Sequence, residues 1–174
     1  MADQPDGIVL RRHRDLQGRG WHPWLRRGLL GLIALVLVLA LFDVFGQASS
    51  TTRAEAGAAT LSVSAPGAVR GGLLFQFRIT TEAHTELRDA TLVLNQAWIN
   101  GLTVNTIEPS PLNEASRDGN LVFDLGHLPH GSKHVLYLDY QVNPTTVGSR
   151  TLRLELQDGE TPVTSLERTL RIFP

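Results

Sequence analysis

The densest group of side chains that could do chemistry in this 174-residue chain is three histidines and an aspartate. Asp124, His127, His130 and His134 fall within eleven residues, and imidazole with carboxylate can ligate Zn²⁺ or Cu²⁺. Their spacing crosses a turn instead of following one helix face, and we expect strand alternation to direct His134 away from the core. Two interpretations stay open, a metal- or ligand-sensing site and a solvent-exposed turn, and the pattern favours the exposed turn.

Other kinds of catalytic site find little support in the residue types. The chain has no cysteine, which excludes disulfides, zinc–thiolate sites and thiol nucleophiles, and which favours a bacterial source. It has no Gly-x-Ser-x-Gly elbow, phosphate-binding loop or His-Glu-x-x-His pair, and its glutamates are scattered. Trp98 is either a binding-surface aromatic or a packing residue, and packing is favoured. We therefore expect that the chain is not an enzyme and that it binds neither a cofactor nor a metal ion.

The elements that position these residues follow a period-two pattern from residue 60 onward. Apolar residues alternate with polar ones, for example in Leu73–Ile79 and Leu136–Val142, and Gly, Pro and Asp-Gly turns separate the runs. This pattern predicts an all-β domain over residues 60–174, an immunoglobulin-like antiparallel β-sandwich of seven to eight strands. Such a domain is large enough to fold on its own core.

An apolar run precedes this domain and predicts a single transmembrane α-helix over residues 25–46. Residues 28–42 contain no charge, and residues 44–46 extend the run beyond Asp43. The side chains expected to anchor it at the membrane surfaces are Trp21, Trp24, Arg26, Arg27 and Asp43. Asp43 marks either the outer membrane boundary, which is favoured, or a pairing site for a partner's helix.

The flanking charges predict how the chain crosses the membrane. Residues 1–27 hold six Arg against three Asp, a net of +3, whereas the stretch after the run has no cation before Arg53. The positive-inside rule then places residues 1–24 in the cytoplasm as a disordered basic tail, residues 47–59 outside as a linker, and residues 60–174 outside the cell membrane. Cleavage as a signal peptide is the alternative, at residues 46–48 or 54–56, and an uncleaved anchor is favoured.

One segment carries a resemblance to a known family. Phe123-Asp124-Leu125-Gly126-His127-Leu128-Pro129-His130-Gly131-Ser132, followed by the alternating residues 135–142, resembles the conserved-repeat and CARDB-type Ig-like domains of bacterial surface proteins. The likeness covers about residues 60–174. It implies an Ig-like fold at a cell surface and no reaction, because such domains act as spacers, stalks and adhesion modules. Here there is one such unit instead of a string of repeats.

The function that these features predict is that of a membrane-anchored accessory subunit of the cell envelope, non-catalytic and either protein-binding or structural. Its partners would be the lipid bilayer and another membrane or envelope protein, with no nucleic acid and no small-molecule substrate. Recognition would use a strand edge or a sheet face. The alternative is a metal- or ligand-binding sensor that uses the turn of His127, His130 and His134.

Overall fold

The computed structural model describes residues 21–41 and 48–174, which form two separate units. The first unit is a helix, α1 (His22–Leu41), whose 20 residues give a length of about 30 Å. None of its side chains is buried. The helix is long and apolar enough to cross a bilayer, and a signal sequence near an N-terminus has the same properties. It begins three residues before the predicted start. Asp43 lies outside the described residues.

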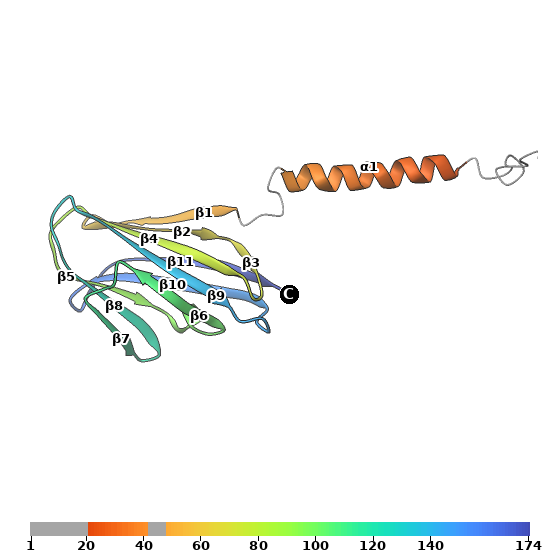
Figure 1. The fold of residues 1–174 in the computed structure, drawn as a ribbon. Coiled ribbons are helices and arrows are strands. Elements are labelled where there is room, and N and C mark those ends of the chain that lie inside the picture. Colours follow the sequence, from red (N-terminus) through yellow and green to blue (C-terminus); the bar gives the residue numbers. More distant parts are fainter. Residues whose placement is uncertain (1–20, 42–47) are drawn as a thin grey trace, which may run out of the picture. The chain divides into compact units, whose positions relative to one another are not determined.

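The second unit is a domain of two β-sheets (Figure 1). Its strands are β1 (Ser49–Glu55), β2 (Ala59–Pro66), β3 (Ala68–Arg70), β4 (Leu74–Ala83), β5 (Leu87–Leu94), β6 (Leu102–Glu108), β7 (Asn113–Arg117), β8 (Asn120–Leu128), β9 (Lys133–Val142), β10 (Gly148–Asp158) and β11 (Thr161–Phe173), with a 3₁₀ helix, η2 (Gln96–Trp98), between β5 and β6. The five-stranded sheet has the order β1-β2-β4-β9-β6, and the six-stranded sheet has the order β3-β11-β10-β5-β8-β7. Neighbouring strands are antiparallel except β3 and β11, which run parallel.

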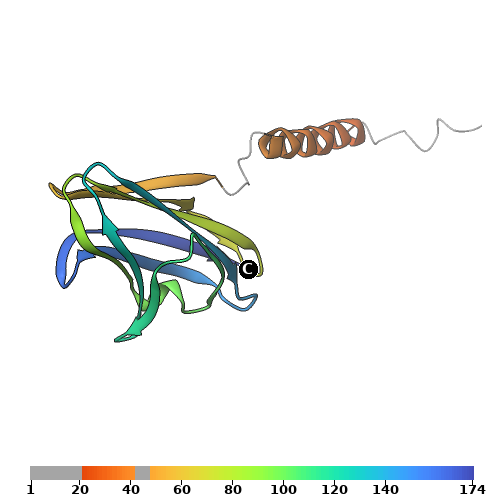
Figure 2. The same cartoon turned by 60° about the vertical axis from the view of Figure 1, so that its left-hand side comes forward.

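The two sheets pack face to face, as Figure 2 shows, and their inward residues form one core. The alternating residues read from the sequence fill it, including Phe75, Phe77 and Ile79 of β4, opposite leucines of β5 and β10. Every residue of this core lies between Ala59 and Ile172, so the domain carries its own hydrophobic core and does not depend on α1. The predicted β-sandwich is confirmed.

The structure differs from the sequence analysis in the number of strands and in where the domain begins. It has eleven strands among the described residues instead of seven to eight, and β1 lies within the stretch expected to be a linker. The strands that the pattern did not show are β1, β3, β6 and β7, which all lie at sheet edges. They lack apolar alternation because they contribute little to the core, and β1 is held by pairing with β2 along its whole length.

Candidate functional site

The outer face of the five-stranded sheet carries a ladder of paired side chains along β4 and β9. Residues directly opposite each other in an antiparallel pair point to the same face of the sheet. The outward pairs are Leu74 with Gln141, Gln76 with Asp139, Arg78 with Tyr137, Thr80 with Val135, and Glu82 with Lys133. We call this surface the β4–β9 face.

Tyr137 and Arg78 occupy the centre of the β4–β9 face. Tyr137 is 36% exposed, whereas the residues on either side of it along the strand point into the core. The guanidinium carbon of Arg78 lies 5.9 Å from the centre of this ring, within the range of a cation–π contact. Tyrosine and arginine are the side chains most enriched at protein interfaces together with tryptophan, because they offer apolar area and directed donors at once.

A polar network beside this pair fixes three strands to one another. The side-chain amide of Gln76 donates to Asp139 Oδ1 at 2.8 Å, and the hydroxyl of Thr106 on β6 donates to Asp139 Oδ2 at 2.9 Å. Both oxygens of the carboxylate therefore accept from neighbouring strands. The network holds β4, β9 and β6 in register and leaves little side-chain freedom to lose on binding.

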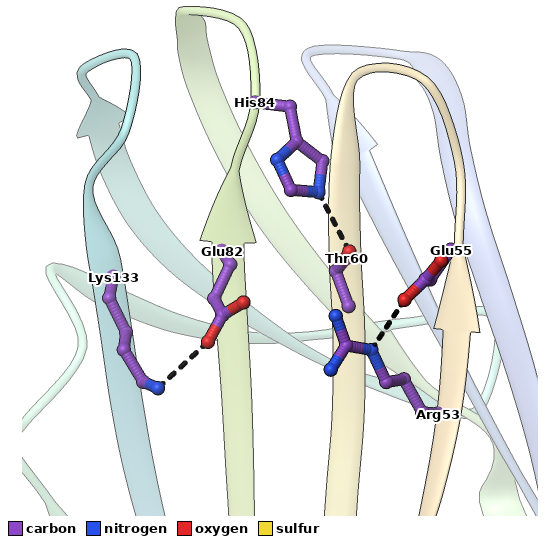
Figure 3. A network of polar contacts seen from close by, with 6 residues as sticks. All are labelled: Arg53, Glu55, Thr60, Glu82, His84 and Lys133. Atoms are coloured by element: carbon purple, nitrogen blue, oxygen red, sulfur yellow. Dashed lines mark hydrogen bonds and ion pairs between the residues drawn. The ribbon is translucent and has the colours of Figure 1, made fainter.

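The β4–β9 face ends in a row of charged residues that crosses four strands (Figure 3). Lys133 Nζ lies 2.7 Å from Glu82 Oε1, and Arg53 Nε lies 2.8 Å from Glu55 Oε1. Between these ion pairs, the imidazole of His84 lies over β2, with its Nε2 2.7 Å from the hydroxyl of Thr60. The hydrogen bond from Lys133, followed by the charge of Lys133, lowers the pKa of Glu82. The row therefore presents fixed charges of both signs at neutral pH.

The edges of the two sheets are less suited to binding a partner than the β4–β9 face. An exposed edge invites pairing with another strand unless it is short, bulged or covered. β3 and β7 have only three and five residues. The register of β6 shifts between Val104 and Thr106, and Pro109 follows it. A side chain from the other sheet binds the remaining edge, β1, as described below. Face recognition is therefore favoured over strand addition.

No protein-family model and no curated protein matches the chain. Solved structures do match. A CARDB domain from Pyrococcus furiosus aligns with a TM-score of 0.42 and 12% identity, covering 63% of this chain and 89% of that one. CaCohA2 from Clostridium acetobutylicum aligns with a TM-score of 0.47 and 15% identity, covering 68% and 92%. The chitin-binding domain of a Pyrococcus furiosus chitinase gives 0.40 and 15%, covering 64% and 98%. A CARDB domain, the type that the sequence resembles, is thus among the structures similar to this chain.

The residues considered as metal ligands do not form a cluster. Asp124 and His127 belong to β8 in the six-stranded sheet, whereas His134 belongs to β9 in the other sheet, and His130 lies in the turn between them. The Nε2 atom of His127 is 3.0 Å from Glu86 Oε1, and Asp124 Oδ1 accepts a hydrogen bond from the backbone N–H of Gly126. Within residues 21–41 and 48–174, no three His, Asp or Glu side chains are placed to hold a metal ion.

The expectation that His134 points away from the core is wrong. On β9 it has the same parity as Leu136 and Leu138, which are fully buried, so its ring is turned inward at the end of the core. Burial lowers the pKa of His134, and its Nε2 has no hydrogen-bond partner among the described residues. His134 is therefore a neutral packing residue, facing away from the surface that carries Lys133 and Tyr137.

The six-stranded sheet has a different outer surface, with an open hollow of about 300 Å³. Asp89, Asp124, Glu160 and Arg117 line it together with other polar residues, so it carries more negative than positive charge. It contains no tyrosine or tryptophan and no arrangement of three metal ligands among the residues that the structure describes. The hollow is a weaker candidate than the β4–β9 face.

Trp98, for which binding and packing were both considered, lies in the core. It is fully buried, its ring centre is 4.5 Å from that of Phe77, and its indole N–H donates to the carbonyl of Arg153 at 2.9 Å. The 3₁₀ helix η2 places this ring between the two sheets, where it also contacts Tyr140. The packing interpretation is confirmed.

Arg168 is the residue that the sequence analysis missed. It occupies an inward position of β11 between Leu166 and Leu170 and is only 6% exposed. Its guanidinium crosses to the five-stranded sheet, where it donates to the carbonyl of Ser50 at 2.7 Å, to the hydroxyl of Ser50 at 3.0 Å, and to the carbonyls of Val63 and Ala65. Burial lowers the pKa of Arg168. The signal was an arginine at a core position of an otherwise regular alternation.

The expected anchoring residues lie at the start of α1. Trp21 immediately precedes the helix, Trp24 lies in its first turn, and both rings are more than half exposed. Arg26 and Arg27 follow, and the guanidinium carbon of Arg27 lies 5.6 Å from the centre of the Trp24 ring. Aromatic and cationic side chains thus sit together at one end of the apolar helix, which is where interfacial anchors occur in membrane proteins.

Proposed function

We propose that the chain is a membrane-tethered binding module, in which α1 anchors it in the cell membrane and the β4–β9 face binds another protein of the cell envelope. The domain is an Ig-like β-sandwich, and α1 is uncharged and apolar from residue 28 to its end without being buried. In this proposal residues 1–24 lie in the cytoplasm and residues 60–174 lie outside. The tether raises the concentration of the domain near membrane-bound partners without adding any contact.

The observation that carries the proposal is the exposed Arg78–Tyr137 pair at the centre of a rigid polar surface. Gln76 and Asp139 on one side are hydrogen-bonded, and Glu82 and Lys133 farther along the ladder are ion-paired, so a partner would dock against a largely preformed face. Residues of this kind at the centre of an interface contribute about 2 kcal/mol or more each, which corresponds to a roughly 30-fold change in Kd.

The position of β1 argues against cleavage at one of the two sites considered, and in that respect supports an uncleaved anchor. Cleavage at residues 54–56 would separate β1 from β2 and remove Ser50, which binds Arg168. Cleavage at residues 46–48 would leave the strand in place. The mass of the mature protein distinguishes these outcomes directly.

The test is site-specific photo-crosslinking of the full-length chain in its own membranes. A benzophenone amino acid replaces Tyr137 in one sample and Thr169, exposed on the outer face of the other sheet, in the control. We expect a discrete crosslinked protein from position 137 and none from position 169, and we expect Arg78→Ala to reduce the yield from position 137. Equal products from both positions, or none from position 137, would overturn the proposal for this face.

Fractionation tests the anchor separately. Full-length protein is expected to stay in the membrane pellet after extraction with alkaline carbonate, and added protease is expected to degrade residues 60–174 in spheroplasts. Release into the soluble fraction, or a domain that is protected until the cells are lysed, would show that the anchoring or the orientation is wrong.

A further inference from the structure

One end of the sandwich collects most of the exposed apolar side chains of the domain. Seven large hydrophobic residues of residues 48–174 are exposed, and four of them are Leu73, Leu74, Val147 and Phe173, with exposures of 43%, 61%, 57% and 54%. They come from three segments that are far apart in the sequence. Scattered single exposed hydrophobics need no explanation, but a contiguous group of them does.

Backbone hydrogen bonds bring these three segments together. The N–H of Gly71 donates to the carbonyl of Phe173 at 2.8 Å, and the N–H of Gly72 donates to the carbonyl of Val142 at 3.0 Å. Gly148, next to Val147, pairs with Ile172 at the end of β11. The turn between β3 and β4, the loop between β9 and β10, and the end of β11 therefore form one surface. We call it the entry end, because β1 also begins there, opposite Pro66 (Figure 1).

The two ends of the sandwich differ sharply in charge. Residues 48–50, 66–74, 99–104, 142–150 and 170–174 around the apolar group contain Arg70, Arg150 and Arg171 but no Asp or Glu, and the β7–β8 turn at the same end of the six-stranded sheet adds Arg117 and Asp118. The turns of the opposite end, at residues 55–60, 82–90, 126–134 and 156–162, contain six carboxylates against two Lys or Arg. Arg70 and Arg171 are exposed beside the apolar group. Exposed apolar side chains with arginines beside them and no carboxylate in the adjoining segments are the pattern of a surface that meets lipid headgroups.

The chain itself limits how far the entry end can be from a bilayer. Seven residues, 42–48, separate the last residue of α1 from the first residue of β1. The eight Cα-to-Cα steps from Leu41 to Ser49 span at most about 29 Å even when fully extended. If α1 crosses the membrane, as in the proposed function on which this step rests, the start of β1 lies within that distance of the bilayer in any orientation of the domain.

We propose that the entry end rests on the outer surface of the lipid bilayer, with Leu73, Leu74, Val147 and Phe173 in the headgroup region and the exposed Arg70 and Arg171 beside lipid phosphates. This contact orients the domain. The β4–β9 face then stands at the side of the sandwich and its charged row points away from the membrane, where a partner protein can reach both.

Single-cysteine labelling tests this contact, since the chain has no cysteine of its own. Leu74→Cys in the full-length chain carries an environment-sensitive fluorophore, and Leu112→Cys is the matched control, because Leu112 is 75% exposed and lies outside the entry end. The labelled proteins are reconstituted in vesicles of phosphatidylcholine and phosphatidylglycerol. We expect position 74 to show blue-shifted emission and quenching by lipids brominated near the headgroup, about 5–10 Å below the surface, and position 112 to show neither.

A second variant tests whether the apolar group causes the contact. The exposed residues Leu73 and Leu74 are both changed to Ser and the label is moved to Val147→Cys, which should lose its shift while far-UV circular dichroism stays unchanged. Equal emission at positions 74 and 112 in protein that co-floats with the vesicles would overturn this inference and leave the anchor intact. A shift that occurs in native membranes but not in lipid vesicles would also overturn it, since a protein would then cover this end. If the labelled protein did not co-float with the vesicles, this result would instead count against the membrane anchor of the proposed function.

Discussion

Replacing Arg168 with alanine removes the side chain that joins the last strand of the domain to its first. Arg168 lies on β11, and its hydrogen-bond acceptors lie on β1 and β2 of the opposite sheet. Ser50 is paired with Ala65 across these two strands, so one guanidinium holds both members of a ladder pair. The substitution should therefore loosen β1 more than any other strand.

The contacts set the size of the effect. A hydrogen bond from a charged donor contributes about 1.5–3 kcal/mol, and a buried acceptor left without a partner costs about 1–3 kcal/mol. The contact to the Val63 carbonyl is long, at 3.4 Å, and Ser50 is exposed enough for water to replace the lost donor. The substitution also removes the free-energy cost of burying a cation in the folded state, which offsets part of this loss. We expect a net loss of about 2–4 kcal/mol in the free energy of unfolding.

Urea unfolding of a fragment of residues 48–174 measures this loss, because Trp98 is then its single tryptophan and reports on the core. Arg171→Ala, on the same strand but exposed, is the control and should change stability by less than about 0.5 kcal/mol. Native-state hydrogen exchange of Arg168→Ala should show lost protection in β1 before any in β9. If Arg168→Ala costs no more than Arg171→Ala, the assigned role of this side chain is wrong.

Three further substitutions test the packing of the domain. Tyr140→Phe should raise the free energy of unfolding by about 1 kcal/mol in urea titrations, because the buried Tyr140 hydroxyl has no partner among the described residues; a loss of similar size would show that it has one. His134→Gln should flatten the acid side of the stability profile. Burial lowers the pKa of His134 below 6.5, so at lower pH the unfolded state binds more protons than the folded state. The free energy of unfolding of the wild type should therefore fall as the pH drops below 6.5. Identical pH profiles of the wild type and the variant from pH 5 to 8 would contradict this prediction. Gly101→Ala should cost about 1–3 kcal/mol more in thermal melts than Gly119→Ala. Both glycines have positive φ, but an added Cβ at Gly101 would lie 2.5 Å from Thr146 Oγ1, whereas Gly119 faces open space; equal losses would refute the clash.

The sequence predicted the fold where burial imposes a period. In β4 and β9 every second residue enters the core, so the alternation of Phe75, Phe77 and Ile79 with polar residues identified these strands correctly. It could not identify β1, whose residues are small and polar and which is held by backbone pairing with β2. Pairing of this kind depends on the partner strand and leaves no pattern in the strand's own residues.

The candidate site was harder to predict than the fold because it depends on register. Arg78 and Tyr137 are 59 positions apart, and nothing in either segment shows that they face each other until β4 and β9 are aligned. The histidines attracted attention because they are close in sequence, yet the turn after β8 carries the chain from one sheet to the other and separates them. Arg168 was detectable in principle, since a charge at an inward position of β11 must find partners inside the fold.

The same features that close the sandwich also leave its faces free for binding. Arg168 binds Ser50 of the edge strand β1, a register shift interrupts β6 and Pro109 follows it, and the other two edges are too short to extend. In the proposed tethered state, domains concentrated at a membrane would otherwise meet edge to edge, which is the usual route to aggregation of exposed sheets. Blunted edges combined with a rigid face that presents Tyr137 and Arg78 therefore favour recognition of a partner through side chains, and Arg168 should matter for stability without contributing to partner binding.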